Sequence, residues 1–273
     1  MTPHPNMRET YGLTLVELGR KNRNIVALEA DLGKSTRSVL FQEAFPDRYF
    51  QMGIAEQNMA AAAAGLALVG KIPFIHSFAV FAAGRTFDQL RNTVSIPKLK
   101  IRVCGSSCGF SDFGDGKTHQ SVEDVAIMRS LPNMTVLSPM DSIETIKMME
   151  CLIDLPGPVY IRINRSDLPF LFPVDEPYHI GKITKLRNGS DVALLATGVM
   201  VSRSLEAAGL LTEKDISARV FNLSTIKPLN REALIEAVTG VRAIVVSEEH
   251  NIVGALAGPC SRRYELCPMH PSN

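Results

Sequence analysis

The sequence contains no tryptophan, few aromatic residues and no excess of charge. Its 273 residues include 29 lysines and arginines against 28 aspartates and glutamates, with no block of like charges. Nucleic-acid-binding proteins usually carry a basic cluster or stripe, so this pattern argues against that function. The chain also lacks a run of about 18 apolar residues and an apolar signal segment at its start. We therefore expect a cytoplasmic protein that binds neither nucleic acid nor a membrane.

Cysteine is scarce as well. The five cysteines are Cys104, Cys108, Cys151, Cys260 and Cys267. An odd, scattered set in a chain of this length predicts reduced thiols and no disulfide framework. Cys104 and Cys108 form a CxxxC pair without a second pair of ligands nearby, and Cys260, Cys267 and His270 lack the spacing of a common zinc site. We therefore predict no metal site on this chain.

Hydrophobic residues make up 45% of the chain, enough for a large core. In residues 1–168, short β-branched runs alternate with helical patterns. The expected strands are 24–30, 48–53, 71–78, 98–105, 133–139 and 157–164, and the expected helices are 53–70, 85–94, 121–131 and 142–155. Apolar strands alternating with helices predict an α/β domain with a mostly parallel sheet flanked by helices on both faces.

A proline-rich segment, residues 169–188, interrupts this alternation and is interpreted as a linker. The alternation then restarts in residues 189–273. Strands are expected at 191–197, 216–222 and 242–248, with helices near 201–212 and 230–239. The sequence therefore predicts a second, smaller α/β domain of the same mostly parallel kind.

The stretch "GIAEQNMAAAAAGLALVG" places one carboxylate, Glu56, at the start of a small-residue helix. An acid in the first turn of a helix is favoured by the helix dipole, which is a sufficient structural explanation by itself. Phe78 and Phe81 follow an expected strand, where aromatic rings pack in a core or stack on a flat heterocycle. The loop "GDGKTHQ" holds Asp115 and His119 before a helix, a usual place for ligand contacts. No Asn pair follows it, so it does not form a diphosphate–magnesium motif.

Four segments together resemble the transketolase family of thiamine-diphosphate enzymes. They are "MGIAEQNMAAAAAGLAL", "PFIHSFAVF", "GDGKTHQSVEDVAIMRSLPNM" and "IRINRSDLP". The likeness covers residues 8–252 and is strongest to the C-terminal subunit of a split transketolase. It implies a pyrimidine-binding domain followed by a transketolase C-terminal domain, without the diphosphate-binding domain.

The resemblance implies a site for thiamine diphosphate shared between subunits. Glu56 would contact the ring nitrogen of the aminopyrimidine and act in catalysis. Phe81 would stack on that ring with Phe78 beside it, and Asp31 would lie near the cofactor. The diphosphate and its Mg²⁺ would be held by an N-terminal partner subunit, with self-association into a heterotetramer.

The same resemblance implies sugar contacts. Asp115 and His119 would hold substrate hydroxyls, with His119 also catalytic. Arg8, Ser35, His119 and Arg165 would bind the terminal phosphate or nearby hydroxyls of a sugar phosphate. Arginine suits phosphate because its guanidinium makes bidentate, charge-assisted hydrogen bonds. The implied activity is two-carbon ketol transfer from a ketose phosphate to an aldose.

Three features depart from the family pattern. Ser107 stands where the family often has a second histidine. His76 stands where a small residue is commoner; it could be a compensating ligand or a packed side chain, and packing is the favoured interpretation. The tail "PCSRRYELCPMHPSN" has no helical period, so the second domain is expected to be truncated or altered after about residue 258.

Two other functions stay open. A subunit of the kind that makes deoxyxylulose phosphate shares "GIAEQ", "DGKTHQ" and "FDQL", and a non-catalytic dimerisation or regulatory subunit would keep the fold without the chemistry. The "THQ" loop argues against the β subunits of 2-oxoacid dehydrogenases. The sequence leaves open the sugar and the identity of the partner.

Overall fold

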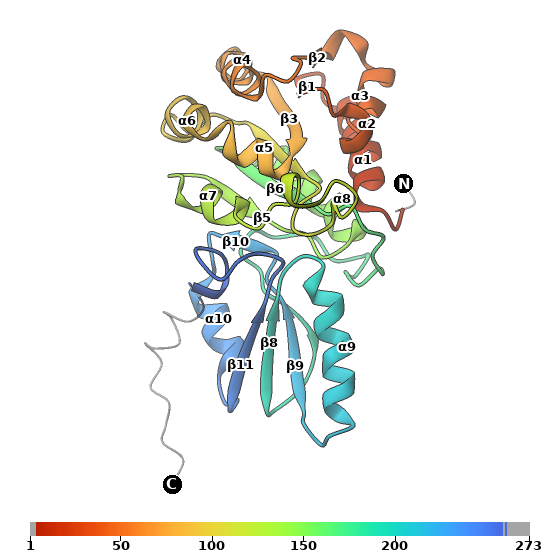
Figure 1. The fold of residues 1–273 in the computed structure, drawn as a ribbon, viewed down its shortest axis with the longest axis vertical. Helices are drawn as coiled ribbons and strands as arrows, with labels where there is room; N and C mark the ends of the chain where they lie inside the picture. The colour runs from red at the N-terminus through yellow and green to blue at the C-terminus, as the bar shows by residue number, and fades with distance from the viewer. Residues whose placement is uncertain (1–3, 259, 261–273) are drawn as a thin grey trace.

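The computed structural model describes residues 4–258 and 260, and in this part of the chain the strands form two sheets (Figure 1). The first sheet has seven strands in the order β10-β5-β6-β4-β3-β1-β2. These strands are β1 (Ile25–Glu29), β2 (Tyr49–Gln51), β3 (Ile72–Phe78), β4 (Arg102–Ser106), β5 (Thr135–Leu137), β6 (Val159–Ile163) and β10 (Thr225–Lys227). All neighbours are parallel except β10 and β5.

The pairing of the strands brings the loops of the candidate site together at one end of this sheet, where the parallel strands finish. Phe78, Ser106 and Ile163, the last residues of β3, β4 and β6, lie side by side. Glu29 at the end of β1 pairs with His76 of β3. Because parallel strands end at the same edge, the segments that follow them converge there.

Helices cover both faces of the first sheet. On one face α1 (Met7–Lys21), α3 (Val39–Ala44) and α8 (Ser142–Leu152) pack with the sheet in one apolar cluster. On the other face lie α4 (Glu56–Leu68), α5 (Ala79–Gly84), the π-helix η2 (Leu90–Ser95) and α7 (Asp124–Ser130). The shorter elements are α2 (Gly33–Thr36), α6 (Phe87–Gln89), η1 (Pro46–Arg48) and η3 (Gly116–Thr118).

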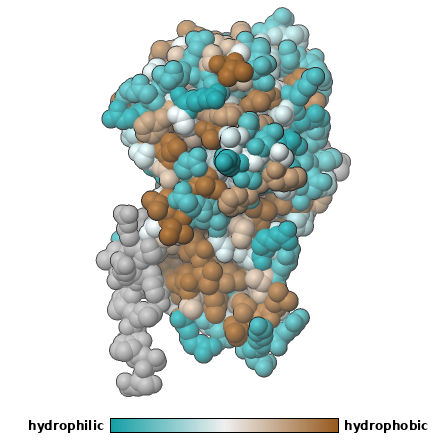
Figure 2. Space-filling view, viewed as in Figure 1, coloured by the Kyte–Doolittle hydropathy of each residue, from teal (hydrophilic) through white to brown (hydrophobic). Residues whose placement is uncertain are grey.

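The second sheet has four strands in the order β11-β8-β9-β7. They are β7 (Thr184–Arg187), β8 (Val192–Ala196), β9 (Ala218–Asn222) and β11 (Ala243–Ser247), with helices α9 (Met200–Thr212) and α10 (Arg231–Val238). Hydrophobic side chains gather over this sheet in Figure 2, and Val245 of β11 is 47% exposed. The predicted fold class is confirmed for the described residues.

The structure corrects several predicted elements. The helix expected at 85–94 is divided into α6 and η2, where the wider π turn leaves the regular repeat. β7 lies inside the expected linker and pairs antiparallel with β9. β10 crosses back to the first sheet and pairs with β5. The altered tail expected after about residue 258, with Cys267 and His270, lies outside the described residues apart from Cys260.

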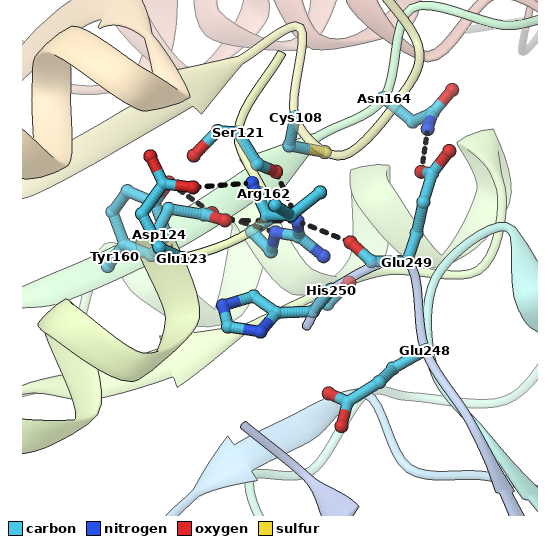
Figure 3. Close-up of polar contacts among 12 residues, drawn as sticks. Cys108, Ser121, Glu123, Asp124, Tyr160, Arg162, Asn164, Glu248, Glu249 and His250 are labelled. Atoms are coloured by element: carbon cyan, nitrogen blue, oxygen red, sulfur yellow. Dashed lines mark hydrogen bonds and ion pairs between the residues drawn. The ribbon is translucent and has the colours of Figure 1, made fainter. Parts of the chain in front are cut away.

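A buried ion pair and its hydrogen-bonded neighbours lie between the first sheet and the segment after β11 (Figure 3). The Arg162 guanidinium of β6 lies 2.8 Å from the Asp124 carboxylate of α7, and Tyr160 donates a 2.7 Å hydrogen bond to the same carboxylate. Arg162 also donates to the Glu249 carbonyl at 3.2 Å, and Asn164 donates to the Glu249 carboxylate at 3.1 Å. Glu249 follows β11, so these contacts tie the second sheet to the first.

The same contacts fix the base of the loop that carries His119. Gly109 and Ser121 close this loop with two backbone hydrogen bonds of 2.9 and 3.1 Å. Gly109 has a φ of +62°, and a Cβ there would lie 2.2 Å from the Glu249 carboxylate. The positive φ therefore favours glycine at position 109, and a side chain there would also displace the Glu249 carboxylate.

The described part of the chain contains no helix that is both long and apolar enough to span a membrane. Within the same residues, no group of three or more His, Cys, Asp or Glu side chains is arranged to hold a metal ion.

Arg102 is the largest fully buried side chain, and it caps the end of α8. Its guanidinium donates to the carbonyls of Leu152, Leu155 and Gly157. We predict that Arg102→Met lowers the free energy of unfolding by about 3 kcal/mol, because buried carbonyls lose their donors. Urea unfolding measures the loss. Arg203→Met, which removes a surface arginine with a 64% exposed side chain, is the control. Equal stability of the two variants would contradict this role.

Candidate active site

Glu56 is the first residue of α4, and its carboxylate is buried although the helix start is open on one side. The residue is 4% exposed and lines a hollow of about 540 Å³ with residues 54–58, Gly84 and Arg85. Its Oε1 accepts a 2.6 Å charge-assisted hydrogen bond from Arg85. The structure therefore holds a carboxylate at a cavity wall, paired on one oxygen with a half-exposed guanidinium.

Arg85 connects this carboxylate to an aromatic group. The Phe78 and Phe81 rings are stacked at 6.3 Å with 13° between their planes, and the His119 ring meets both edge-on at 5.9 and 5.3 Å. The Arg85 guanidinium lies 4.2 Å from the centre of the Phe81 ring. Glu56, Arg85, Phe81, Phe78 and His119 thus form one continuous contact chain from three different segments.

His119 is held in a defined orientation. Its Nδ1 shares a 2.9 Å hydrogen bond with the Thr118 hydroxyl. This contact leaves Nε2 as the ring nitrogen that can meet a substrate group.

Three of the expected site residues form a second group. Arg8, in the first turn of α1, donates to the Ser35 carbonyl at 2.9 Å. Asn6, the N-cap of α1, donates to the Arg165 carbonyl at 2.9 Å and joins this helix to the segment after β6. Burial lowers the pKa of Arg8, and the neighbouring Arg165 and Arg37 charges lower it further. The structure therefore gathers several guanidinium groups here.

The two remaining expected residues are not joined to either group. Asp115 is exposed, and no contact links its carboxylate to His119 or to the arginines among the described residues. Asp31 is also exposed and has a φ of +64°, and its backbone N–H donates to the Gln51 side chain at 2.9 Å. Sugar and cofactor contacts by these two aspartates stay predictions.

Sequence reasoning missed Arg85 and Asp112. Arg85 follows Phe81 by four residues, and that helical spacing was a usable signal for contact between them. Asp112 is fully buried and its Oδ1 lies 2.6 Å from Nη1 of Arg165, which is 53 residues further along the chain. No local pattern in the sequence could indicate that pairing.

His76 of β3 and Ser107, the two substitutions that depart from the family pattern, are both buried. His76 shares hydrogen bonds with the Tyr11 hydroxyl at 2.9 Å and the Leu28 carbonyl at 3.0 Å, and burial lowers its pKa to about 4. It is a packed, neutral imidazole. Ser107 is also fully buried, with a φ of +53°.

Glu29 organises the loop that carries Asp31 and Ser35. Its buried carboxylate accepts hydrogen bonds from two backbone N–H groups and two hydroxyls of that loop. The donors are Ala30, Leu32, Thr36 and Ser38. Burial raises the pKa of Glu29 from 4.5 to about 7, against the opposing effect of these hydrogen bonds.

This shift gives a pH prediction. Between pH 4.5 and about 7 the unfolded chain loses a proton that folded Glu29 keeps, so the free energy of unfolding falls as pH rises and levels off above that range. Glu29→Gln cannot ionise, and we expect it to remove about 3 kcal/mol of this decline. Denaturant unfolding at pH 4.5, 6 and 8 measures the difference. The exposed Glu43→Gln variant should match the wild type, and an unchanged decline in Glu29→Gln would contradict the assignment.

The fold and contacts define a class of protein: an α/β subunit with a buried acid, an aromatic pair and a cationic group at the edge of a parallel sheet. Residues 4–170 match the family model of the transketolase pyrimidine-binding domain, and residues 181–263 match that of the transketolase C-terminal domain. The chain belongs to the transketolase family.

Relatives and solved structures agree with this assignment. A putative transketolase C-terminal section from Methanocaldococcus jannaschii is 41% identical over 93% of this chain and 80% of its own length. The 6-deoxy-6-sulfo-D-fructose transketolase subunit SqwH of a Clostridium species is 39% identical over 96% of this chain and 82% of its own. A split gene transketolase solved as an inactive beta4 tetramer has a TM-score of 0.88 and 44% identity over 97% of this chain and 87% of that one.

Proposed function

We propose that this chain is the C-terminal subunit of a split transketolase and supplies the pyrimidine-binding half of a thiamine-diphosphate site. The observation that carries the proposal is Glu56, a buried carboxylate that Arg85 connects to the Phe78–Phe81 pair. The family depends on thiamine diphosphate. The reaction proposed is two-carbon ketol transfer from a ketose phosphate to an aldose.

The residues present fit the aminopyrimidine of that cofactor. A flat nitrogen heterocycle needs an apolar surface for its face and a hydrogen-bonding group at its edge. Phe81, packed on the buried Phe78 ring, offers the first, and Glu56 offers the second at the wall of the hollow that Arg85 also lines. When bound, thiamine diphosphate supplies the carbon nucleophile that accepts the two-carbon unit.

The side chains of this chain would handle protons and orientation. Glu56 would share a proton with the ring nitrogen, and a carboxylate shielded from water is suited to that exchange. Arg85, bonded to one Glu56 oxygen, would fix the carboxylate and leave the other oxygen for the ring. His119 would bind substrate hydroxyls through Nε2.

The proposal requires an N-terminal partner subunit. Mg²⁺ and the diphosphate would be held by that partner, since this chain matches the pyrimidine-binding and C-terminal domains of the family. The split gene transketolase solved as an inactive beta4 tetramer supports the need for a second kind of chain. We propose that the two chains form a heterotetramer in the cytoplasm.

The names of the relatives do not point to one sugar substrate. Their names include 6-deoxy-6-sulfo-D-fructose transketolase and apulose-4-phosphate transketolase subunits. The distal end of the sugar therefore differs among members of the family.

Reconstitution tests the reaction class. With the partner, thiamine diphosphate and Mg²⁺, we expect hydroxypyruvate to serve as donor to an aldose acceptor and pyruvate to give no product. Product formation is followed by chromatography. Turnover by this chain alone would contradict the shared site, and pyruvate as the better donor would favour a deoxyxylulose-phosphate-forming enzyme.

Substitution of Glu56 tests the residue. Glu56→Gln keeps the shape of the side chain but cannot exchange the proton, so we predict a loss of kcat of about 100-fold. The matched control is Glu43→Gln on the exposed side of α3, which should retain full activity. If Glu56→Gln were as active as the control, the chain would act as a non-catalytic subunit.

A further inference from the structure

The group of arginines at the edge of the sheet is largely neutralised by carboxylates of this same chain. Arg37 is paired with Glu9 at 2.5 Å, and Arg165 is paired with Asp112 at 2.6 Å. Three guanidiniums and two carboxylates leave this group a net charge of +1, carried by Arg8. Arg8 is close enough to feel Arg165, Arg37 and Asp112 electrostatically.

Asp112 is the decisive member of this group. It is fully buried, whereas the Arg165 side chain is 35% exposed. The Asp112 carboxylate therefore lies on the interior side of the Arg165 guanidinium. Asp112 Oδ2 and Arg8 Nε are buried without a hydrogen-bond partner among the described residues. Both atoms are enclosed by protein, so Asp112 acts on a bound anion through its charge and not through direct contact.

A phosphate monoester is a poor match to this arrangement. It carries a charge of about −1.5 to −2 at neutral pH and binds best to arginines with free pairs of N–H groups. Here one nitrogen of Arg165 is occupied by Asp112, whose negative charge lies next to any anion bound to that guanidinium.

We propose that Asp112 is a specificity-determining residue, which disfavours doubly charged phosphate and selects sugars whose distal end carries at most one negative charge. The inference deepens the proposed function and rests on it, because the sugar is recognised only in the course of that reaction. The family resemblance implies a ketose phosphate as donor. The inference adds that the phosphate gives such a sugar no advantage over its unphosphorylated form.

The test compares two acceptors that differ only in the phosphate, D-erythrose and D-erythrose 4-phosphate. The reconstituted complex is assayed with hydroxypyruvate as donor, and kcat/KM is measured for each acceptor. For the wild type we expect the phosphorylated acceptor to have no advantage. For Asp112→Asn, which keeps the shape but loses the charge, we expect kcat/KM for the phosphorylated acceptor to rise by about tenfold, through KM, with the other acceptor unchanged.

Two further variants complete the design. Glu9→Gln releases Arg37 in the same group and should move the ratio in the same direction, which keeps the test informative if Asp112→Asn folds poorly. Asp154→Asn, on an exposed residue after α8, should leave the ratio unchanged.

The outcomes are separable. A wild-type preference of about tenfold or more for D-erythrose 4-phosphate would overturn the inference. Turnover in which neither Asp112→Asn nor Glu9→Gln changes the ratio would overturn it too, while the proposed function would stand. Absence of ketol transfer to both acceptors would contradict the proposed function and the inference together.

Discussion

The buried ion pair between Asp124 and Arg162 is the interaction on which the site depends. It joins α7 to β6, fixes the base of the loop that carries His119 and reaches the second sheet through Glu249. Breaking a buried pair by removing one partner leaves an uncompensated charge and is strongly destabilising. The two sheets and both ends of the loop are thus held by one set of contacts, and the His119 ring of that loop packs edge-on against Phe78 and Phe81.

Two clusters with different electrostatic character lie at the edge of the first sheet. At α4 a single carboxylate and a single guanidinium, Glu56 and Arg85, adjoin an aromatic surface. At α1 the arginines are partly neutralised by internal carboxylates. The first arrangement suits proton exchange with a neutral heterocycle, whereas the second suits an uncharged or weakly charged sugar end.

Much of the fold could be predicted from the sequence because apolar strands alternate regularly with helices. The strands around Ile75 and Val103 are buried on both faces and leave a clear pattern. β7 and β10 are short and take their place from partner strands distant in sequence, so no local pattern marks them. The residues expected at the cofactor could be identified from motifs. Asp112 could not, because its pairing with Arg165 forms only where the loop after β4 meets the segment after β6.

The central claim is that Glu56 meets the aminopyrimidine of thiamine diphosphate at the junction between two subunits. The structure of the complete complex with the cofactor, by crystallography or electron cryomicroscopy, tests it most directly. The account predicts a Glu56 carboxylate oxygen at about 2.6–3.0 Å from a pyrimidine ring nitrogen, within hydrogen-bond range. A cofactor bound elsewhere, with Glu56 facing solvent, would contradict it.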